Sequence, residues 1–217
     1  MKLHLDIFPS AQKKLWPLLK AIPKEFVLYG GTAIALQLGH RISVDFDFFS
    51  DFPLDKDKLV SHFPLLEKCS LVQPEINTID CIVDFSEGPV KLQFLAGLGK
   101  RQKRVEAPLI ARDNQLQIAS LKDLLATKLN TIQHRAECKD YIDIDAIIKS
   151  GLSLEEGLGC AVAVYGKSFD PATSLRALCS YRDGDLQELR EVIKERLSAH
   201  AAAVEKIPKI LPLDQSI

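Results

Sequence analysis

The chain has 217 residues, of which 47% are hydrophobic and 26% are charged, and its formal net charge at pH 7 is -1. This composition is typical of a globular protein and excludes intrinsically disordered, collagen-like and coiled-coil chains. The near-zero net charge argues against a nucleic-acid-binding protein with a generally basic surface, although it leaves room for a local basic patch.

The first part of the chain, residues 1–115, is expected to mix helices and strands. Ser10 is a suitable N-cap for the first helix, and Pro17 is expected to kink or end it, because proline has no backbone N–H. Two β-prone runs on either side of a short turn with Gly88 are typical of a hairpin. The expected segments are a helix over 10–21, a strand over 25–29, a helix over 32–38, a strand over 44–49, a helix over 55–63 and strands over 78–85 and 89–96.

The remainder of the chain, residues 116–217, is expected to be all helical. Ser153 and Glu156 match a capping box, and Asp170 followed by Pro171 matches an N-cap with proline at the first helical position. The expected helices cover 119–133 and 139–149, start at 153 and at 170, and end with one from Asp185 to residue 206. The sequence therefore predicts an α+β domain with a mixed sheet over 1–115, followed by a helical domain over 116–217.

A strand, a Gly-Gly turn and a helix follow one another between residues 25 and 38. Gly30 and Gly31 leave the backbone N–H groups at the helix N-terminus unhindered, and the helix dipole is positive there. The turn is therefore suited to a phosphate group, although a Gly-Gly at a strand–helix junction is, by itself, usually only a turn.

Two carboxylates, Asp45 and Asp47, stand two residues apart on the next expected strand, so both point to the same face. Their Cα atoms are expected about 6.5–7 Å apart, and the two charges repel each other unless they are solvated or hold a cation. Paired carboxylates suit Mg²⁺, which takes one or two of them together with water and phosphate oxygens. An isolated Asp-x-Asp is usually surface charge, but after the glycine turn it describes equipment for phosphoryl or nucleotidyl transfer.

The string GGTAIALQLGHRISVDFDFFS, residues 30–50, resembles the glycine and Asp-x-Asp signature of the DNA polymerase β-like nucleotidyltransferases, and in particular of the AbiEii/AbiGii-type toxin family. Later residues are similar to the later motifs of that family, namely Ser120 to Asp123, Lys128, and Arg135 to Asp143. The resemblance covers residues 25–145.

This resemblance implies a nucleotidyltransferase that uses Mg²⁺ or Mn²⁺ and moves a nucleotidyl group from a nucleoside triphosphate to an acceptor. In some family members the acceptor is the 3′ end of tRNA, and several members are toxins with a cognate antitoxin. The implied site, in a cleft between the two domains, consists of phosphate contacts from Gly30, Gly31 and Thr32, metal ligands Asp45 and Asp47, and Lys128 with Asp140 or Asp143. Arg41, in the loop before the aspartates, is a further candidate for phosphate contact, with an ordinary loop arginine as the alternative.

One position departs from the superfamily pattern. The third carboxylate expected on a later strand aligns with Gln93, a neutral residue, and Asp84 on the preceding strand is the first candidate to replace it. Without a third carboxylate, a metal ion that activates the acceptor hydroxyl would be weakly held. The alternative function is therefore a nucleotide-binding regulatory or interaction module that has lost turnover.

Three features also have ordinary structural interpretations. Lys128 is expected at the open, polar edge of its helix, where a surface ion-pair network with Asp140 and Asp143 is the alternative to a catalytic role. The basic cluster at 100–104 is either a solvated loop or a contact for a polyanionic substrate. The five cysteines contain no CxxC pair, and no stretch has signal-peptide or membrane-span character, so we expect reduced thiols and a cytoplasmic protein without membrane contact.

Overall fold

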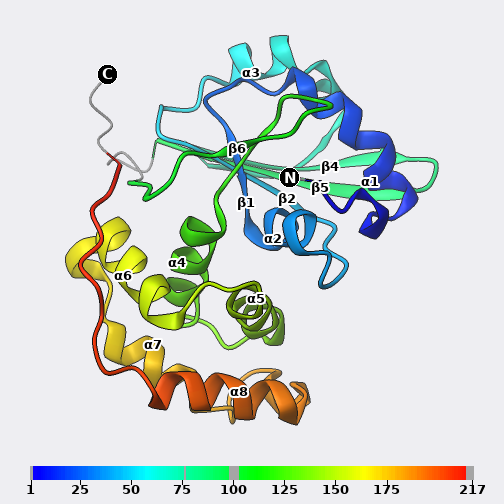
Figure 1. Ribbon diagram of the computed structural model, residues 1–217. Helices are drawn as coiled ribbons and strands as arrows, with labels where there is room; N and C mark the ends of the chain where they lie inside the picture. Colours follow the sequence, from blue (N-terminus) through cyan, green and yellow to red (C-terminus); the bar gives the residue numbers. More distant parts are fainter. Residues whose placement is uncertain (1, 76, 98–102, 214–217) are drawn as a thin grey trace. The chain divides into compact units, whose positions relative to one another are not determined.

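The computed structural model describes residues 2–75, 77–97 and 103–213 (Figure 1). The chain forms two compact units, each described by itself. The sheet unit consists of Met1–Gln102 and Pro108–Ala119, and the helical unit consists of Lys103–Ala107 and Ser120–Ile217. The described residues include no helix that is both long enough and apolar enough to cross a membrane.

The sheet unit is built on a mixed sheet, as the sequence predicts. Among the described residues it has seven strands in the order β3-β4-β5-β2-β1-β7-β6. β1 runs antiparallel to β2 and parallel to β7, and β2 runs parallel to β5. The strands are β1 (Val27–Tyr29), β2 (Phe46–Ser50), β3 (Ser70–Glu75), β4 (Thr78–Phe85), β5 (Gly88–Ala96), β6 (Leu109–Ile110) and β7 (Gln117–Ile118). β4 and β5 form the predicted hairpin, whereas β3, β6 and β7 were not predicted.

The helices of the sheet unit follow from their local sequence. α1 ends directly before Trp16 and continues as a 3-10 helix, which agrees with the expected effect of Pro17. The Asp55 carboxylate accepts a hydrogen bond from the backbone N–H of Lys58 at 2.9 Å, so Asp55 is the N-cap of α3. The helical segments are η1 (Leu5–Ile7), α1 (Ser10–Leu15), η2 (Trp16–Ala21), α2 (Gly30–Leu38), α3 (Lys56–His62) and η3 (Pro64–Lys68).

One face of the central strands belongs to the core. Phe46 and Phe48 of β2 and Phe94 of β5 are fully buried, and the Phe48 and Phe94 rings stack with centroids 5.0 Å apart. Because successive side chains of a strand alternate between faces, the residues between these phenylalanines lie on the opposite face. Asp47 is one of them, so the same alternation that builds the core directs this carboxylate away from it.

The helical unit confirms most of the expected helices. Ser120 and Ser153 cap α4 and α6, with a complete capping box at Ser153, and Asp170 caps α7. The segments are α4 (Leu121–Thr131), α5 (Cys138–Lys149), α6 (Leu154–Tyr165), η4 (Gly166–Ser168), α7 (Pro171–Ala177), η5 (Leu186–Glu188) and α8 (Glu191–Ala202).

The expected long helix from Asp185 to residue 206 is wrong. The Asp185 carboxylate accepts a hydrogen bond from the backbone N–H of Cys138 at 2.6 Å, so it satisfies the first turn of α5 instead of capping its own helix. Only a short 3-10 turn follows Asp185, and the last α-helix begins six residues later at Glu191 and ends at Ala202.

A segment without regular secondary structure, residues 103–107, also belongs to the helical unit. The buried Asp123 carboxylate accepts hydrogen bonds from the backbone N–H groups of Val105 and Glu106, at 2.8 and 3.3 Å, and from the Ser120 hydroxyl at 2.7 Å. The backbone N–H of Leu213 donates to the carbonyl of Arg104 at 2.7 Å. Of the basic cluster at 100–104, residues 100–102 lie outside the described residues.

Candidate active site

The turn between β1 and α2 brings a glycine backbone against a carboxylate. Gly30 has a φ of +70°, which favours glycine, and a Cβ built on it would lie 2.1 Å from Oδ2 of Asp47. Asp47 is the residue of β2 directly opposite Tyr29 on β1, so strand pairing places its carboxylate beside the start of α2. Glycine is therefore required at position 30 for both the backbone conformation and the space.

A cation lies over the same helix start. A Cβ built on Gly31 would lie 2.2 Å from Nη2 of Arg41, so the guanidinium group packs directly on the glycine backbone. Nη1 of Arg41 donates a hydrogen bond to the carbonyl of Ile42 at 3.0 Å. The positive charge of Arg41 adds to the positive end of the α2 dipole, which is a favourable environment for a phosphate group.

Thr32 ties the aspartate loop to α2. Its hydroxyl is hydrogen-bonded to the backbone carbonyl of Asp45 and to the Ser43 hydroxyl, which is 3.0 Å away, and the residue is fully buried. The Thr32 side chain is therefore already engaged, and any contact with phosphate would come from its backbone N–H. Ser43 was not predicted as a site residue, because its role depends on the loop returning to α2.

The two predicted metal ligands differ in their placement. Asp47 lies within β2, whereas Asp45 comes just before the strand and is exposed. Their carboxylates are hard oxygen donors of the kind that Mg²⁺ prefers. The start of α2 at Gly30 and Gly31, next to Asp47, is called the phosphate cradle below, after its predicted ligand. Among the residues that the structure describes, no three His, Cys, Asp or Glu side chains form a ready metal-binding group. A cation held here would therefore take its remaining ligands from substrate, water or neutral oxygens.

Gln93 has the expected position beside the aspartates, but the suggested replacement for it is wrong. Gln93 on β5 is the direct partner of Asp47 on β2, and its other strand partner is Asp80 on β4. Asp84 pairs with Pro89 and is exposed, four residues further along β4. Strand register therefore makes Asp80, not Asp84, the carboxylate next to Gln93.

In the helical unit, the predicted residues Lys128, Asp140 and Asp143 form one buried cluster. Nζ of Lys128 lies 2.6 Å from Oδ1 of Asp140 and 2.7 Å from Oδ2 of Asp143. The Lys128 side chain is 7% exposed and both carboxylates are 0% exposed, so the expected position at an open helix edge is wrong. The reason is that Asp140 and Asp143, three residues apart on α5, direct both carboxylates towards the Lys128 ammonium group.

Arg135 completes the charge balance of this cluster. Its Nε and Nη2 donate to Oδ2 and Oδ1 of Asp140, at 2.8 and 3.1 Å, in a bidentate pair. Burial acts to raise the pKa of Asp140, but the hydrogen bond from Arg135 and the charge of Lys128 outweigh it and lower the pKa below its ordinary value. Two cations thus pair with two buried carboxylates in this cluster.

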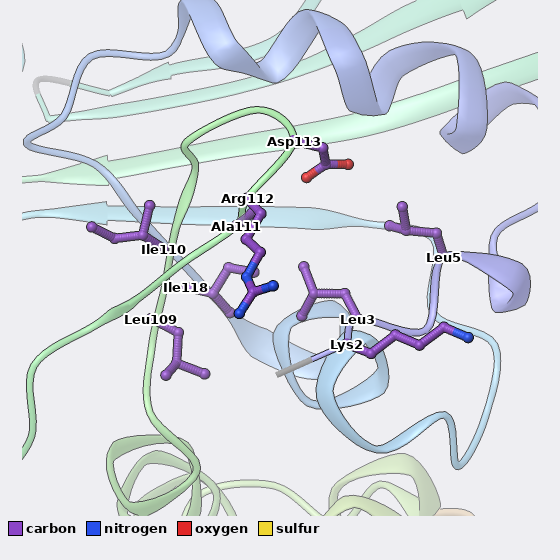
Figure 2. Close-up of a pocket in the computed structure, with 9 residues that line it drawn as sticks. All are labelled: Lys2, Leu3, Leu5, Leu109, Ile110, Ala111, Arg112, Asp113 and Ile118. Atoms are coloured by element: carbon purple, nitrogen blue, oxygen red, sulfur yellow. The ribbon is translucent and has the colours of Figure 1, made fainter.

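A cavity of about 580 Å³ lies elsewhere in the sheet unit, beside β6 and β7 (Figure 2). Its walls are mainly aliphatic, with Leu3, Leu109, Ile110 and Ile118 among them, and Asp113 lies at its margin. The Asp113 carboxylate accepts a hydrogen bond from the Trp16 indole at 2.6 Å. None of the candidate catalytic residues lines this cavity, so it is distinct from the phosphate cradle.

We expect Gly30→Ala to impair the cradle more than the fold. The positive φ costs an alanine about 1–2 kcal/mol, and the new methyl group would displace the Asp47 carboxylate. Transfer to an acceptor is expected to fall about 100-fold, as for misplacement of a catalytic group by about 1 Å. Gly166→Ala is the control, because Gly166 has a φ of +57° but open space around its Cβ position. Equal activity of the two variants would contradict this role of Gly30.

Comparison with known proteins identifies a family and structures of similar fold. The family described as nucleotidyl transferase AbiEii toxin, Type IV TA system, matches residues 19–209. The uncharacterized protein aq_aa25 of Aquifex aeolicus (strain VF5) is 29% identical over 189 residues, which cover 87% of this chain and 86% of that protein. The structure of MenT4, a nucleotidyltransferase toxin from Mycobacterium tuberculosis H37Rv, has a TM-score of 0.62 at 17% identity, covering 88% of this chain and 80% of that one. The structural likeness shows a shared fold.

Proposed function

We propose that this chain, which belongs to the family of AbiEii nucleotidyl transferase toxins, transfers a nucleotidyl group from a nucleoside triphosphate to a hydroxyl group of RNA. The observation that carries the proposal is the start of α2, where the Asp47 carboxylate packs on Gly30 and the Arg41 guanidinium packs on Gly31. A cation ligand and an anion-binding helix terminus thus lie next to each other, as a metal-bound triphosphate requires.

The proposed reaction exchanges a phosphoanhydride bond of the triphosphate for a phosphate ester bond to the acceptor. The oxygen of the acceptor hydroxyl forms a bond to the α-phosphorus, the bond from this phosphorus to the oxygen that bridges to the β-phosphate breaks, and pyrophosphate leaves. The hydroxyl proton passes to solvent. Arg41 and the N-terminal amides of α2 bind the phosphate charge, and Asp45 and Asp47 would hold Mg²⁺ or Mn²⁺, which when bound neutralises charge on the phosphate oxygens.

We further propose that the reaction requires Lys128, Asp140 and Asp143. Because two carboxylates already contact the Lys128 ammonium, we expect it to act by holding Asp140 and Asp143 in their orientation. In this assignment Lys128 is a positioning residue. A substitution of Lys128 should therefore lower turnover only through a change in the two carboxylates.

We further propose a cytoplasmic toxin whose activity is countered by a cognate antitoxin. The support for this is the description of the family as the toxin of a Type IV TA system. Co-expression with the product of the neighbouring gene should restore growth of cells that the chain arrests. Growth arrest that persists unchanged in a variant without transfer activity would contradict a toxic role for the reaction.

The transfer itself is tested with total RNA, Mg²⁺ and each of the four nucleoside triphosphates labelled in turn on the α-phosphorus. We expect RNA to acquire label from an α-labelled triphosphate and none from the same triphosphate labelled on the γ-phosphorus, because pyrophosphate is the leaving group. Label from the γ-phosphate would indicate phosphoryl transfer instead. Nucleotide binding without label in any RNA would favour the binding module that has lost turnover.

A further inference from the structure

Three polar residues form a row across neighbouring strands next to the phosphate cradle. Asp47 on β2 pairs with Gln93 on β5, and Gln93 pairs with Asp80 on β4. The preceding row, Phe46, Leu92 and Cys81, is fully buried in the core. Because side chains alternate along each strand, Asp47, Gln93 and Asp80 lie together on the opposite face, where all three are partly exposed.

The orientation of the Gln93 amide is fixed by chemistry. Its Nε2 donates a hydrogen bond to Oδ1 of Asp80 at 2.7 Å. An ionised carboxylate only accepts hydrogen bonds, so the NH₂ group must face Asp80, and the carbonyl oxygen Oε1 must face away from it. Since Gln93 stands between Asp80 and Asp47 in the row, Oε1 is directed to the Asp47 side.

Asp80 is itself held in place. Its side chain is 17% exposed, and Nζ of Lys91, on the strand that carries Gln93, lies 3.9 Å from its second carboxylate oxygen, Oδ2. A carboxylate that accepts a hydrogen bond from an amide N–H also polarises that amide and makes its carbonyl oxygen a better metal ligand. In metal sites, partners that do not touch the metal orient and strengthen the directly bound ligands in the same way.

We propose that Gln93 Oε1 is the third protein oxygen of the cation site formed with Asp45 and Asp47, and that Asp80 is the positioning residue that orients and polarises it. The inference rests on the proposed function and specifies the ligand set of its metal. It replaces the third carboxylate of the superfamily pattern by a neutral oxygen with a carboxylate behind it. A cation is then held by two charged ligands and one amide, with its other positions open to phosphate and water oxygens.

The test measures metal binding in the absence of turnover. Binding of Mn²⁺ to the full chain, saturated with a non-hydrolysable triphosphate analogue, is followed by electron paramagnetic resonance. We expect Asp80→Ala to weaken Mn²⁺ binding about 10- to 100-fold, the usual effect of removing an outer-shell partner. Asp84→Ala is the matched control, because Asp84 lies on the same face of the same strand but pairs with Pro89; its affinity should stay within twofold of wild type.

A double-mutant cycle separates positioning from direct binding. Gln93→Leu removes the proposed ligand oxygen and should weaken Mn²⁺ binding by as much as Asp80→Ala or more. If Asp80 acts through Gln93, adding Asp80→Ala to Gln93→Leu should cause little further loss. Losses that multiply would show that Asp80 acts on the cation independently and would overturn the positioning role.

Two further outcomes decide the proposal. If Asp80→Ala lowers the melting temperature strongly, Asp80→Asn replaces it, since it keeps an oxygen acceptor for the Gln93 amide and loses only the charge. Wild-type Mn²⁺ affinity in both the Asp80 variant and Gln93→Leu would overturn the inference. A wild type that transfers nucleotide while these variants bind metal normally would leave the proposed function standing and refute the inference alone. Tight Mn²⁺ binding that depends on Asp80, without any transfer, would refute only the function.

Discussion

Lys128→Met is expected to lower the free energy of unfolding by about 3–5 kcal/mol, the usual cost of removing one partner of a buried ion pair. The Lys128 ammonium contacts both Asp140 and Asp143, whose side chains are 0% exposed. Without it, Arg135 still pairs with Asp140, but the contact of Lys128 with Asp143 is lost. Methionine fills a similar volume, so the effect reports charge and not a cavity. Denaturant unfolding of both proteins at pH 7 provides the measurement.

The control for this variant is Lys139→Met on the neighbouring helix α5. Lys139 pairs with Glu137 at 2.8 Å but is 54% exposed, so its loss should change stability by less than about 1 kcal/mol. A Lys128→Met protein as stable as this control would contradict the structural role of the cluster.

The pH dependence of the free energy of unfolding should differ between the two proteins. In the wild type the pKa of Asp140 is lowered on folding, so its contribution is fully present above its ordinary pKa, about 3.8, and is lost as the pH falls through the lower folded value. In Lys128→Met the cluster keeps Arg135 but loses the Lys128 ammonium, so its buried carboxylates should take up protons more readily. The stability difference between the two proteins should therefore shrink as the pH is lowered from 7 towards 4.

Asp45→Ala combined with Asp47→Ala is expected to reduce transfer by at least about 100- to 1,000-fold, the cost of losing a group that stabilises developing charge. The fold should survive, because Asp45 is exposed and removal of the pair relieves a like-charge contact. A triphosphate with Mg²⁺ at a hundredfold excess over its Kd stabilises a folded protein by about 2.7 kcal/mol. The wild type should show the corresponding rise in melting temperature, and the double variant should not.

Asp57→Ala serves as the control for the aspartate pair. It removes an exposed carboxylate in the first turn of α3 and should keep both the transfer activity and the thermal shift. The same shift in the double variant would show that nucleotide binding does not depend on Asp45 and Asp47.

The local sequence was sufficient to predict features that depend only on interactions between neighbouring residues. The helices that begin after Ser153 and Asp170 were predicted because each cap satisfies N–H groups within its own first turn. The glycine turn and the aspartates were found in the same way, since a helix start and an alternating strand have short-range signatures. β6 and β7 were missed because each has only two residues, and β7 joins the sheet through pairing with β1, which is distant in the sequence.

The remaining features depend on contacts between distant segments. The spacing of Asp140 and Asp143 showed that they share a helix face, but not that this face meets Lys128 and buries it. The alternating sequence pattern of β4 places Asp80 on the face away from the core. Only the register of β4 against β5 shows that it is the partner of Gln93. Aspartate is a common N-cap residue, but the Asp185 carboxylate binds the first turn of α5, at Cys138, which is 47 residues away in the sequence.

The placement of residues 103–107 in the helical unit makes the two units interwoven along the chain. The polypeptide leaves the sheet unit after Gln102, returns at Pro108, and leaves it again after Ala119. No single cleavage can therefore separate two complete units. A fragment that stops at residue 115 lacks β7, the parallel neighbour of β1, while a fragment that starts at Ser120 leaves the Asp123 carboxylate without the amides of Val105 and Glu106. Each fragment made by one cut at this junction therefore lacks part of its own unit.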